Sequence, residues 1–270
     1  TSHSDVTYQK WDGKSSSISY TNNVAHVYLT ENAQISDNIF VQNGKTLYLC
    51  LNGKEYASNG TNKIQVKNSG HLVLCDCGES GVIKCATNGW GGMGIYIYTG
   101  TVDIFGGKFT GGSVTGKGGG GAIALEDNSS TLNIYGGEIS GNNGNGKGGA
   151  IYTKSGGTIN MYGGRIAQNK AYRGGGLCLN GSGTLNMYGG LIENNSSTAS
   201  WDTIPANSGN VYVAANAVMN ANAGVVRGGG YAVFNLGTIQ TDDANYPATI
   251  FYSGLYNMGG VVKGGMYYGS

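Results

Sequence analysis

The sequence predicts an all-β protein, folded as a single-stranded right-handed parallel β-helix of about nine coils. Two observations lead to this prediction. The phrase Thr-x-x-x-aromatic-Gly-Gly begins at residues 101, 131, 158 and 184, so consecutive copies lie 30, 27 and 26 residues apart. Each copy also alternates apolar and polar residues with a period of two, which is typical of a strand. Copies of one strand at a nearly fixed period indicate a solenoid.

The composition fits a folded repeat protein and limits the kinds of partner that we expect. Glycine supplies 51 of the 270 residues without the period of collagen, and the 39% apolar content is too high for a disordered chain. The 16 basic and 15 acidic side chains leave a net charge of +1, so bulk electrostatics predict no nucleic-acid partner. No apolar stretch approaches the ~18 residues that span a bilayer, so we expect no membrane insertion. We also expect no cofactor.

The alternation predicts which side chains face the interior of each coil. In the copy that starts at Thr131, Leu132 and Ile134 point inward, whereas Asn133 and Tyr135 point outward. The Gly-Gly pair then bends the chain, because glycine tolerates the backbone angles of a corner. A second strand should follow, and a third after a further glycine run. The inward residues are Phe109, Ile139, Ile166, Ile192 and Val226 in the second strands, and Ile123/Leu125, Ile151/Thr153, Leu177/Leu179 and Val211/Val213 in the third.

Three strands and three polar corners in about 26 residues make one coil of a triangular, pectate-lyase-like solenoid. An isolated coil has almost no interior, so its stability has to come from stacking on its neighbours. Asn142, Asn169 and Asn195 occupy one corner position in successive coils. We therefore expect their side chains to form a hydrogen-bonded ladder along the axis.

The repeat also predicts the domain organisation. Residues 1–24 lack it and are expected to cap one open end of the stack, where unpaired strand edges would otherwise invite aggregation. Residues 25–270 are expected to form the β-helix. Longer spacings indicate loop insertions near 194–209 and 235–249, and binding functions often reside in loops on a rigid scaffold.

Outward aromatic side chains are the candidate ligand-binding residues. Phe105, Tyr135, Tyr162 and Tyr188 should stack on four consecutive coils, and the insertion that carries Trp201 could fold against the Tyr188 end. Such rings could stack on the flat faces of sugars. The alternative is that they only stabilise neighbouring strands. Another strand carries the outward tyrosines Tyr96, Tyr152 and Tyr212.

Four of the five cysteines cluster early in the chain. Cys50 and Cys75 share an outward position on consecutive coils, within reach of a disulfide, and Cys77 and Cys85 bracket a loop that a second disulfide could close. A four-thiol zinc site would need tetrahedral convergence. An extended Cys-Asp-Cys strand would keep its two thiols apart instead of converging them, except across the strand end, so we expect disulfides or free thiols and no metal. Cys178 stands alone and is expected to be an inert thiol.

The acidic residues do not favour catalysis. Glycosidases need two carboxyl groups about 5–9.5 Å apart, flanking the scissile bond. Glu138 and Glu193 lie two coils apart, and Glu138 falls in a column with Lys108 and Arg165. Alternating charges on adjacent strands are typical of a cross-strand ladder. A polysaccharide lyase or glycoside hydrolase therefore stays the alternative to a non-catalytic protein.

Two families resemble this chain. Its coils, with Thr-hydrophobic-x-hydrophobic-x-Gly-Gly followed by Ile-x-x-Asn, resemble glycine-rich surface repeats of gut Firmicutes over about residues 25–235. Gly-Gly-Ala-Ile at 120–123 and 148–151 is similar to the repeat of chlamydial polymorphic outer-membrane proteins, although Ile139, Ile166 and Ile192 replace the Phe of that family.

The resemblance implies an adhesin-like, extracellular or cell-surface module, and neither family carries a catalytic motif to transfer. The implied partner is a host or dietary glycan or a surface protein, and we expect a monomer. A third hypothesis is a structural stalk that only holds another domain away from the cell. A flat aromatic strip without acids would favour binding, whereas covered aromatics without a groove would favour the stalk.

Overall fold

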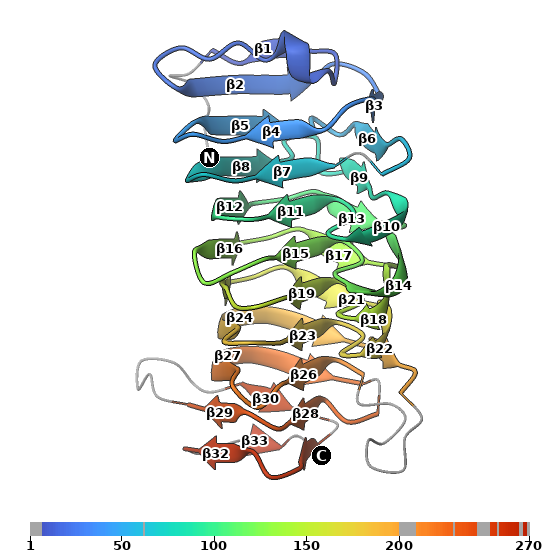
Figure 1. Ribbon diagram of the computed structural model, residues 1–270, viewed down its shortest axis with the longest axis vertical. Coiled ribbons are helices and arrows are strands. Elements are labelled where there is room, and N and C mark those ends of the chain that lie inside the picture. Colours follow the sequence, from blue (N-terminus) through green and yellow to red (C-terminus); the bar gives the residue numbers. More distant parts are fainter. Residues whose placement is uncertain are drawn as a thin grey trace.

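The computed structural model describes residues 7–61, 63–199, 209–228, 230–241, 249–252, 254–264 and 267–268. It confirms the predicted fold class, because the strands stack in parallel along one long axis (Figure 1). The only helical segment among these residues is a 3-10 turn at Ser15–Ser17. The stacked strands form a solenoid of about eight turns.

Two strand columns of each coil belong to one large sheet. The first column carries the repeated phrase, and residues on successive coils are in register, as in the pairing of Leu132 with Ile159. Its strands are Val24–Leu29 (β2), Thr46–Cys50 (β5), Gly70–Cys75 (β8), Gly100–Ile104 (β12), Ser130–Ile134 (β16), Thr158–Met161 (β20), Thr238–Gln240 (β29) and Val261–Lys263 (β32).

The second column follows the corner after each phrase. Its strands are Ala33–Ile35 (β3), Glu55–Ser58 (β6), Val82–Lys84 (β9), Lys108–Thr110 (β13), Glu138–Ser140 (β17), Arg165–Ala167 (β21), Ile250–Phe251 (β30) and Tyr267–Tyr268 (β33). Two longer strands, Thr184–Glu193 (β24) and Val218–Arg227 (β27), run through both columns and join them into one sheet.

The third column forms a separate nine-stranded sheet, with one strand from each coil. It confirms the predicted third strands and their register, since Ile123 pairs with Ile151 and Leu177 with Val211. Its strands are Ile39–Val41 (β4), Ile64–Val66 (β7), Ile95–Ile97 (β11), Ile123–Leu125 (β15), Ile151–Thr153 (β19), Leu177–Leu179 (β23), Val211–Val213 (β26), Val233–Asn235 (β28) and Leu255–Asn257 (β31).

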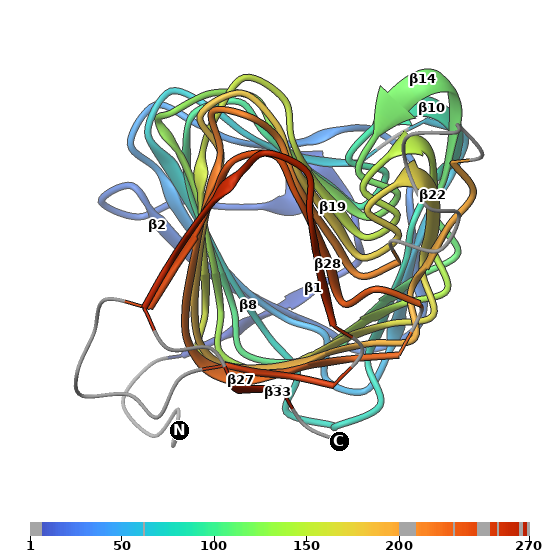
Figure 2. The same ribbon diagram turned by 90° about the horizontal axis from the view of Figure 1, so that it is seen from below.

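One corner differs from the prediction. Between the second and third columns, five coils add a short strand of their own, and these strands stack into a separate corner sheet outside the main ring (Figure 2). The glycine-rich segments show no alternation, so the sequence indicated only a polar corner. Parallel backbone pairing with register shifts nevertheless stabilises them. The strands are Thr87–Gly91 (β10), Ser113–Gly119 (β14), Asn143–Lys147 (β18), Lys170–Arg173 (β22) and Ser196–Ser197 (β25).

The interior follows the predicted alternation. The inward residues of all three columns, among them Leu132, Phe109 and Ile123, have almost no solvent exposure and form one continuous core. A smaller apolar cluster that includes Cys178 and Tyr212 lies on the outer side of the nine-stranded sheet. The corner sheet stands beside that face (Figure 2), so part of the face is covered instead of exposed.

The predicted asparagine ladder is confirmed and is longer than expected. Asn142 Nδ2 donates to Asn169 Oδ1 at 3.0 Å, and Asn169 Nδ2 donates to Asn195 Oδ1 at 2.9 Å. Asn195 in turn donates to Asn210, which enters from beyond the insertion. The four side chains are buried, so their bonds satisfy polar groups that water cannot reach.

The N-terminal segment adds one further strand to the stack. Gln9–Trp11 (β1) pairs in parallel with β2 at one end of the rod (Figure 1). Trp11 is buried there, and its ring packs edge-on against Tyr56 at a centroid distance of 5.0 Å. These residues fall within the segment predicted to be a cap.

The two predicted insertions are described only in part. Residues 200–208, which include Trp201, and residues 242–248 lie outside the described residues. Within the second insertion, β29 is a regular first-column strand that pairs in register with β27.

Candidate functional site

The predicted aromatic column exists, but its rings face one another. Phe105, Tyr135, Tyr162 and Tyr188 follow each other at centroid distances of 4.6, 4.9 and 5.1 Å with interplanar angles of 7, 5 and 12°. Parallel rings at these distances cover each other's faces, so the column presents edges and hydroxyl groups to solvent. A sugar stacks on a ring face, and this arrangement therefore favours stabilisation of neighbouring strands. Trp201, the fifth predicted residue, lies outside the described residues.

A chain of amides runs beside the aromatic column on the same outward face. Asn133 donates to Asp103 Oδ1 at 2.6 Å, and Asn160 donates to Asn133 at 2.8 Å. Three more such bonds extend the chain through Asn186 and Asn220 to Gln240. Each amide donates towards the N-terminal end, so the chain needs an acceptor there, and the Asp103 carboxylate provides it.

His71 completes that end of the amide chain. Its Nε2 lies 2.8 Å from Asp103 Oδ2, in a polar depression of about 390 Å³ that Thr101 and Asn133 also line. Burial alone would raise the pKa of Asp103, but hydrogen bonds from His71 and Asn133 outweigh it and lower that pKa. Asp103 is therefore held as a carboxylate by structural partners.

The predicted charge column is confirmed along the second strands and extends further. Glu138 lies 3.0 Å from Lys108 and 3.3 Å from Arg165, and Glu193 lies 2.8 Å from both Arg165 and Arg227. A hydrogen bond from Ser140 and then the Lys108 ammonium lower the pKa of Glu138. A general acid needs a raised pKa to be protonated at neutral pH. The ion-paired Glu138 and Glu193 therefore do not fit that role.

A groove that the sequence did not predict lies between the corner sheet and the nine-stranded sheet. It encloses about 280 Å³, and its lining residues come from β10, β11, β14, β15 and β19 and from the turn after β19. Trp90 on β10 forms one wall with 83% of its surface exposed, while Tyr96 and Tyr152 line the groove from the nine-stranded sheet. The lining residues are Trp90, Gly91, Tyr96, Gly118, Gly119, Ala124, Tyr152 and Lys154.

Glycine keeps this groove open. A Cβ atom at Gly119 would lie 2.7 Å from Cδ1 of Tyr152, and one at Gly91 would lie 2.2 Å from the carbonyl oxygen of Gly119. A side chain at either position would overlap these atoms, so the close approach of β10, β14 and β19 requires glycine there. The glycine run thus has a structural reason that its sequence pattern alone did not reveal.

Polar groups with fixed partners border the aromatic groove. Lys154 Nζ lies 2.6 Å from Glu126 Oε1, and the Tyr96 hydroxyl donates a hydrogen bond to the same carboxylate. Lys63 Nζ donates to the Gly91 carbonyl oxygen at 2.8 Å and lies 5.7 Å from the Tyr96 ring centroid. Burial raises the pKa of Tyr152 to about 12, so its hydroxyl stays neutral. The groove therefore combines ring surfaces with oriented donors and acceptors.

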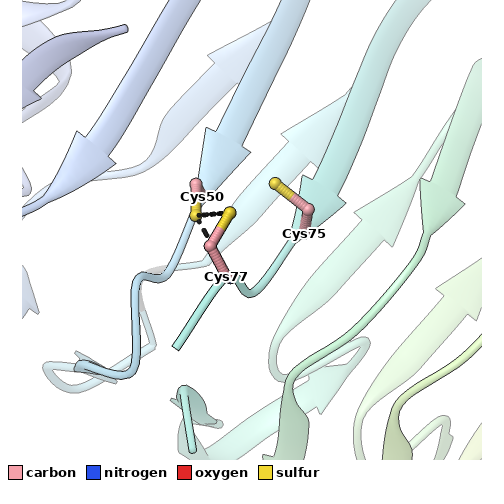
Figure 3. A group of neighbouring side chains, drawn as sticks. All are labelled: Cys50, Cys75 and Cys77. Carbon is pink, nitrogen blue, oxygen red and sulfur yellow. Dashed lines mark hydrogen bonds between the residues drawn. The ribbon is translucent and has the colours of Figure 1, made fainter. Parts of the chain in front are cut away.

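The structure brings three of the four early cysteines together (Figure 3). Cys50 and Cys75 pair in register at the ends of β5 and β8, and Cys77 turns back towards Cys50 just beyond the strand end. Their Sγ atoms all lie within 4.8 Å of one another. Cys85 is instead buried in the core, and burial raises its pKa to about 12. Cys178 is buried in the smaller apolar cluster, in keeping with an inert thiol.

Among the described residues, no helix is long and apolar enough to cross a membrane. Comparisons with protein-family models, curated protein sequences and solved structures found no match to this chain.

Proposed function

We propose that this chain is a non-catalytic, adhesin-like surface module that binds a glycan in the groove between β10 and β19. The observation that carries the proposal is the exposed Trp90 ring beside Tyr96 and Tyr152 in one concave site. Exposed rings in a concavity favour a ligand with a flat apolar face and polar edges. A sugar ring has both, and it would be presented by a host or dietary glycan, outside the cell or at its surface.

The polar groups of the groove suit the edges of such a ligand. Lys154 offers N–H donors, Glu126 offers carboxylate oxygens, and both are already oriented by their mutual ion pair. Sugar hydroxyls can donate to one and accept from the other. The volume of about 280 Å³ lies just below the usual range for ligand sites, which begins at about 300 Å³. We therefore expect recognition of a short saccharide epitope and not of a long polymer segment.

Two observations favour this function over the alternatives. The carboxylates of Glu126, Glu138 and Glu193 are ion-paired, which does not favour a glycosidase or lyase. A stalk would need no groove, and the aromatic column alone would be compatible with one. The groove at Trp90 is the feature that a purely mechanical spacer does not require.

The test is a screen on mucin and plant glycans that scores both retention and cleavage. We expect the wild-type chain to be retained without releasing products, and Trp90→Ala to weaken retention about tenfold or more, the loss of about 1.4 kcal/mol from one ring contact. Tyr162→Ala is the matched control, because it also removes an exposed aromatic ring but one whose faces are stacked.

Circular dichroism should show that both variants stay folded. Equal retention of wild type and Trp90→Ala would contradict ligand binding in the groove. Loss of binding only in Tyr162→Ala would indicate that the aromatic column is the binding site. Released oligosaccharides would contradict the non-catalytic assignment.

A further inference from the structure

The three clustered thiols lie on two successive coils. Cys50 ends β5, Cys75 ends β8, and Cys77 follows two residues later in the turn (Figure 3). Cys50 Sγ lies 3.0 Å from Cys77 Sγ, and all three sulfur atoms lie within 4.8 Å of one another. Side chains two residues apart on a strand share a face but lie about 6–7 Å apart. Here the strand ends at Cys75, so the turn can bring Cys77 back towards Cys50 (Figure 3).

The turn that places Cys77 is itself held firmly. Asp76 accepts a hydrogen bond from Gly81 N–H at 2.6 Å and another from Gly53 N–H on the preceding coil at 2.7 Å. The two turns approach so closely that a Cβ at Gly78 would lie 2.5 Å from the Gly53 nitrogen. The position of Cys77 is therefore fixed by the Asp76 carboxylate and by the close packing of the two turns, contacts that do not involve the thiols.

A backbone N–H group also contacts the cluster. Cys50 Sγ accepts a hydrogen bond from the backbone N–H of Cys77 at 3.4 Å. This contact joins the last residue of β5 to the turn of the next coil and holds the two sulfur-bearing residues side by side.

We propose that Cys50, Cys75 and Cys77 bind a single thiophilic metal ion such as Zn²⁺ through three sulfur ligands. Zinc takes sulfur at about 2.3 Å, which places tetrahedral ligands about 3.8 Å apart, so the Cys50–Cys77 pair would have to separate by less than an ångström. Cys77 is exposed, which leaves a fourth position for water. The ion would link two coils. Because the thiols must lose protons, its affinity should rise with pH.

The test uses the full chain, purified with reductant and shown under denaturing conditions to have all 5 thiols free. Titration with Co²⁺ should produce a sulfur-to-cobalt charge-transfer band that saturates at one equivalent and disappears when Zn²⁺ is added. Losing one ligand should weaken binding about 100-fold or more, since losing even an outer-sphere partner costs 10–100-fold. We therefore expect such a loss in Cys77→Ser and in Cys75→Ser.

Cys178→Ala is the control, because this thiol is buried far from the cluster in the small outer core, and it should bind Co²⁺ as wild type does. Circular dichroism should show that every variant is folded. The proposal is overturned if the fully reduced chain gives no charge-transfer band, or if Cys77→Ser binds as tightly as wild type. It is also overturned if a Cys50–Cys77 disulfide forms equally fast with and without saturating Zn²⁺.

Discussion

Replacing Asn169 by alanine tests whether the buried ladder stabilises the coil stack. The Asn169 side chain is fully buried and takes part in five hydrogen bonds. Its Nδ2 donates to the carbonyl oxygens of Ile139 and Ala167 and to Asn195 Oδ1, each at 2.9 Å. Its Oδ1 accepts from the backbone N–H and the side chain of Asn142, both at 3.0 Å. Alanine would therefore remove contacts to the coils on both sides.

The expected loss in the free energy of unfolding follows from the hydrogen-bonding groups that alanine would leave without a partner. The Asn142 N–H is buried and would lose its acceptor, and an unsatisfied buried donor costs about 1–3 kcal/mol. The remaining bonds contribute about 1 kcal/mol each or less, so we expect Asn169→Ala to lower the free energy of unfolding by about 3–5 kcal/mol. Asn160→Ala is the matched control in the same coil. It breaks two outward amide bonds whose partners can turn to water, and it should cost about 1 kcal/mol or less.

Urea unfolding followed by circular dichroism measures both variants against wild type. We expect the midpoint of Asn169→Ala to fall well below that of Asn160→Ala, with similar spectra before unfolding. If the two variants differ by less than about 1 kcal/mol, the inner ladder is not the stabilising element that its five bonds indicate.

Two further predictions concern charge and close packing. The Arg227 and Arg165 guanidinium groups lower the pKa of Glu193 in the folded protein. The ion pairs therefore stabilise the fold fully above 4.5, the ordinary pKa of a glutamate, and this stabilisation is lost as the pH falls through the lower pKa of folded Glu193. Glu193→Gln should therefore lower the free energy of unfolding by about 1–2 kcal/mol at neutral pH. It should also make stability fall less steeply below pH 4.5, which urea titrations at several pH values would measure. A decline as steep as that of the wild type would contradict this role of Glu193. A Cβ atom at Gly149 would lie 2.0 Å from the Gly175 carbonyl oxygen, whereas one at Gly106 would meet nothing closer than 3.4 Å. Gly149→Ala should lower the free energy of unfolding, measured by thermal unfolding, by about 3 kcal/mol or more, whereas Gly106→Ala should lower it by less than about 1 kcal/mol. Equal losses in the two variants would refute the steric argument.

The sequence determined the β-helix and its core because the relevant forces repeat in every coil. Leu132 and Ile134 face inward for the same reason as their equivalents 27 residues later, so period and alternation were sufficient to predict the register. The inner asparagine ladder and the Lys108–Glu138–Arg165 column followed from the same register, since residues at one position of successive coils must lie side by side.

Only the tertiary structure decided how side chains rotate and how the corner segments pack. Register places Tyr135 above Phe105, but the rotation of each ring is set by packing, and the rings turned out to cover each other's faces. The Trp90 wall depends on a corner strand held by backbone pairing between glycine-rich segments, which leave no pattern of side chains to read.

The thiol cluster shows most clearly which features the sequence predicts and which depend on the folded structure. Register alone placed Cys50 beside Cys75. The convergence of Cys77 instead depends on where β8 ends and on how Asp76 fixes the following turn against the neighbouring coil. The sequence thus determined which strand residues face inward and align from coil to coil, whereas ring orientation and the contacts of turns and corners were decided by the folded structure.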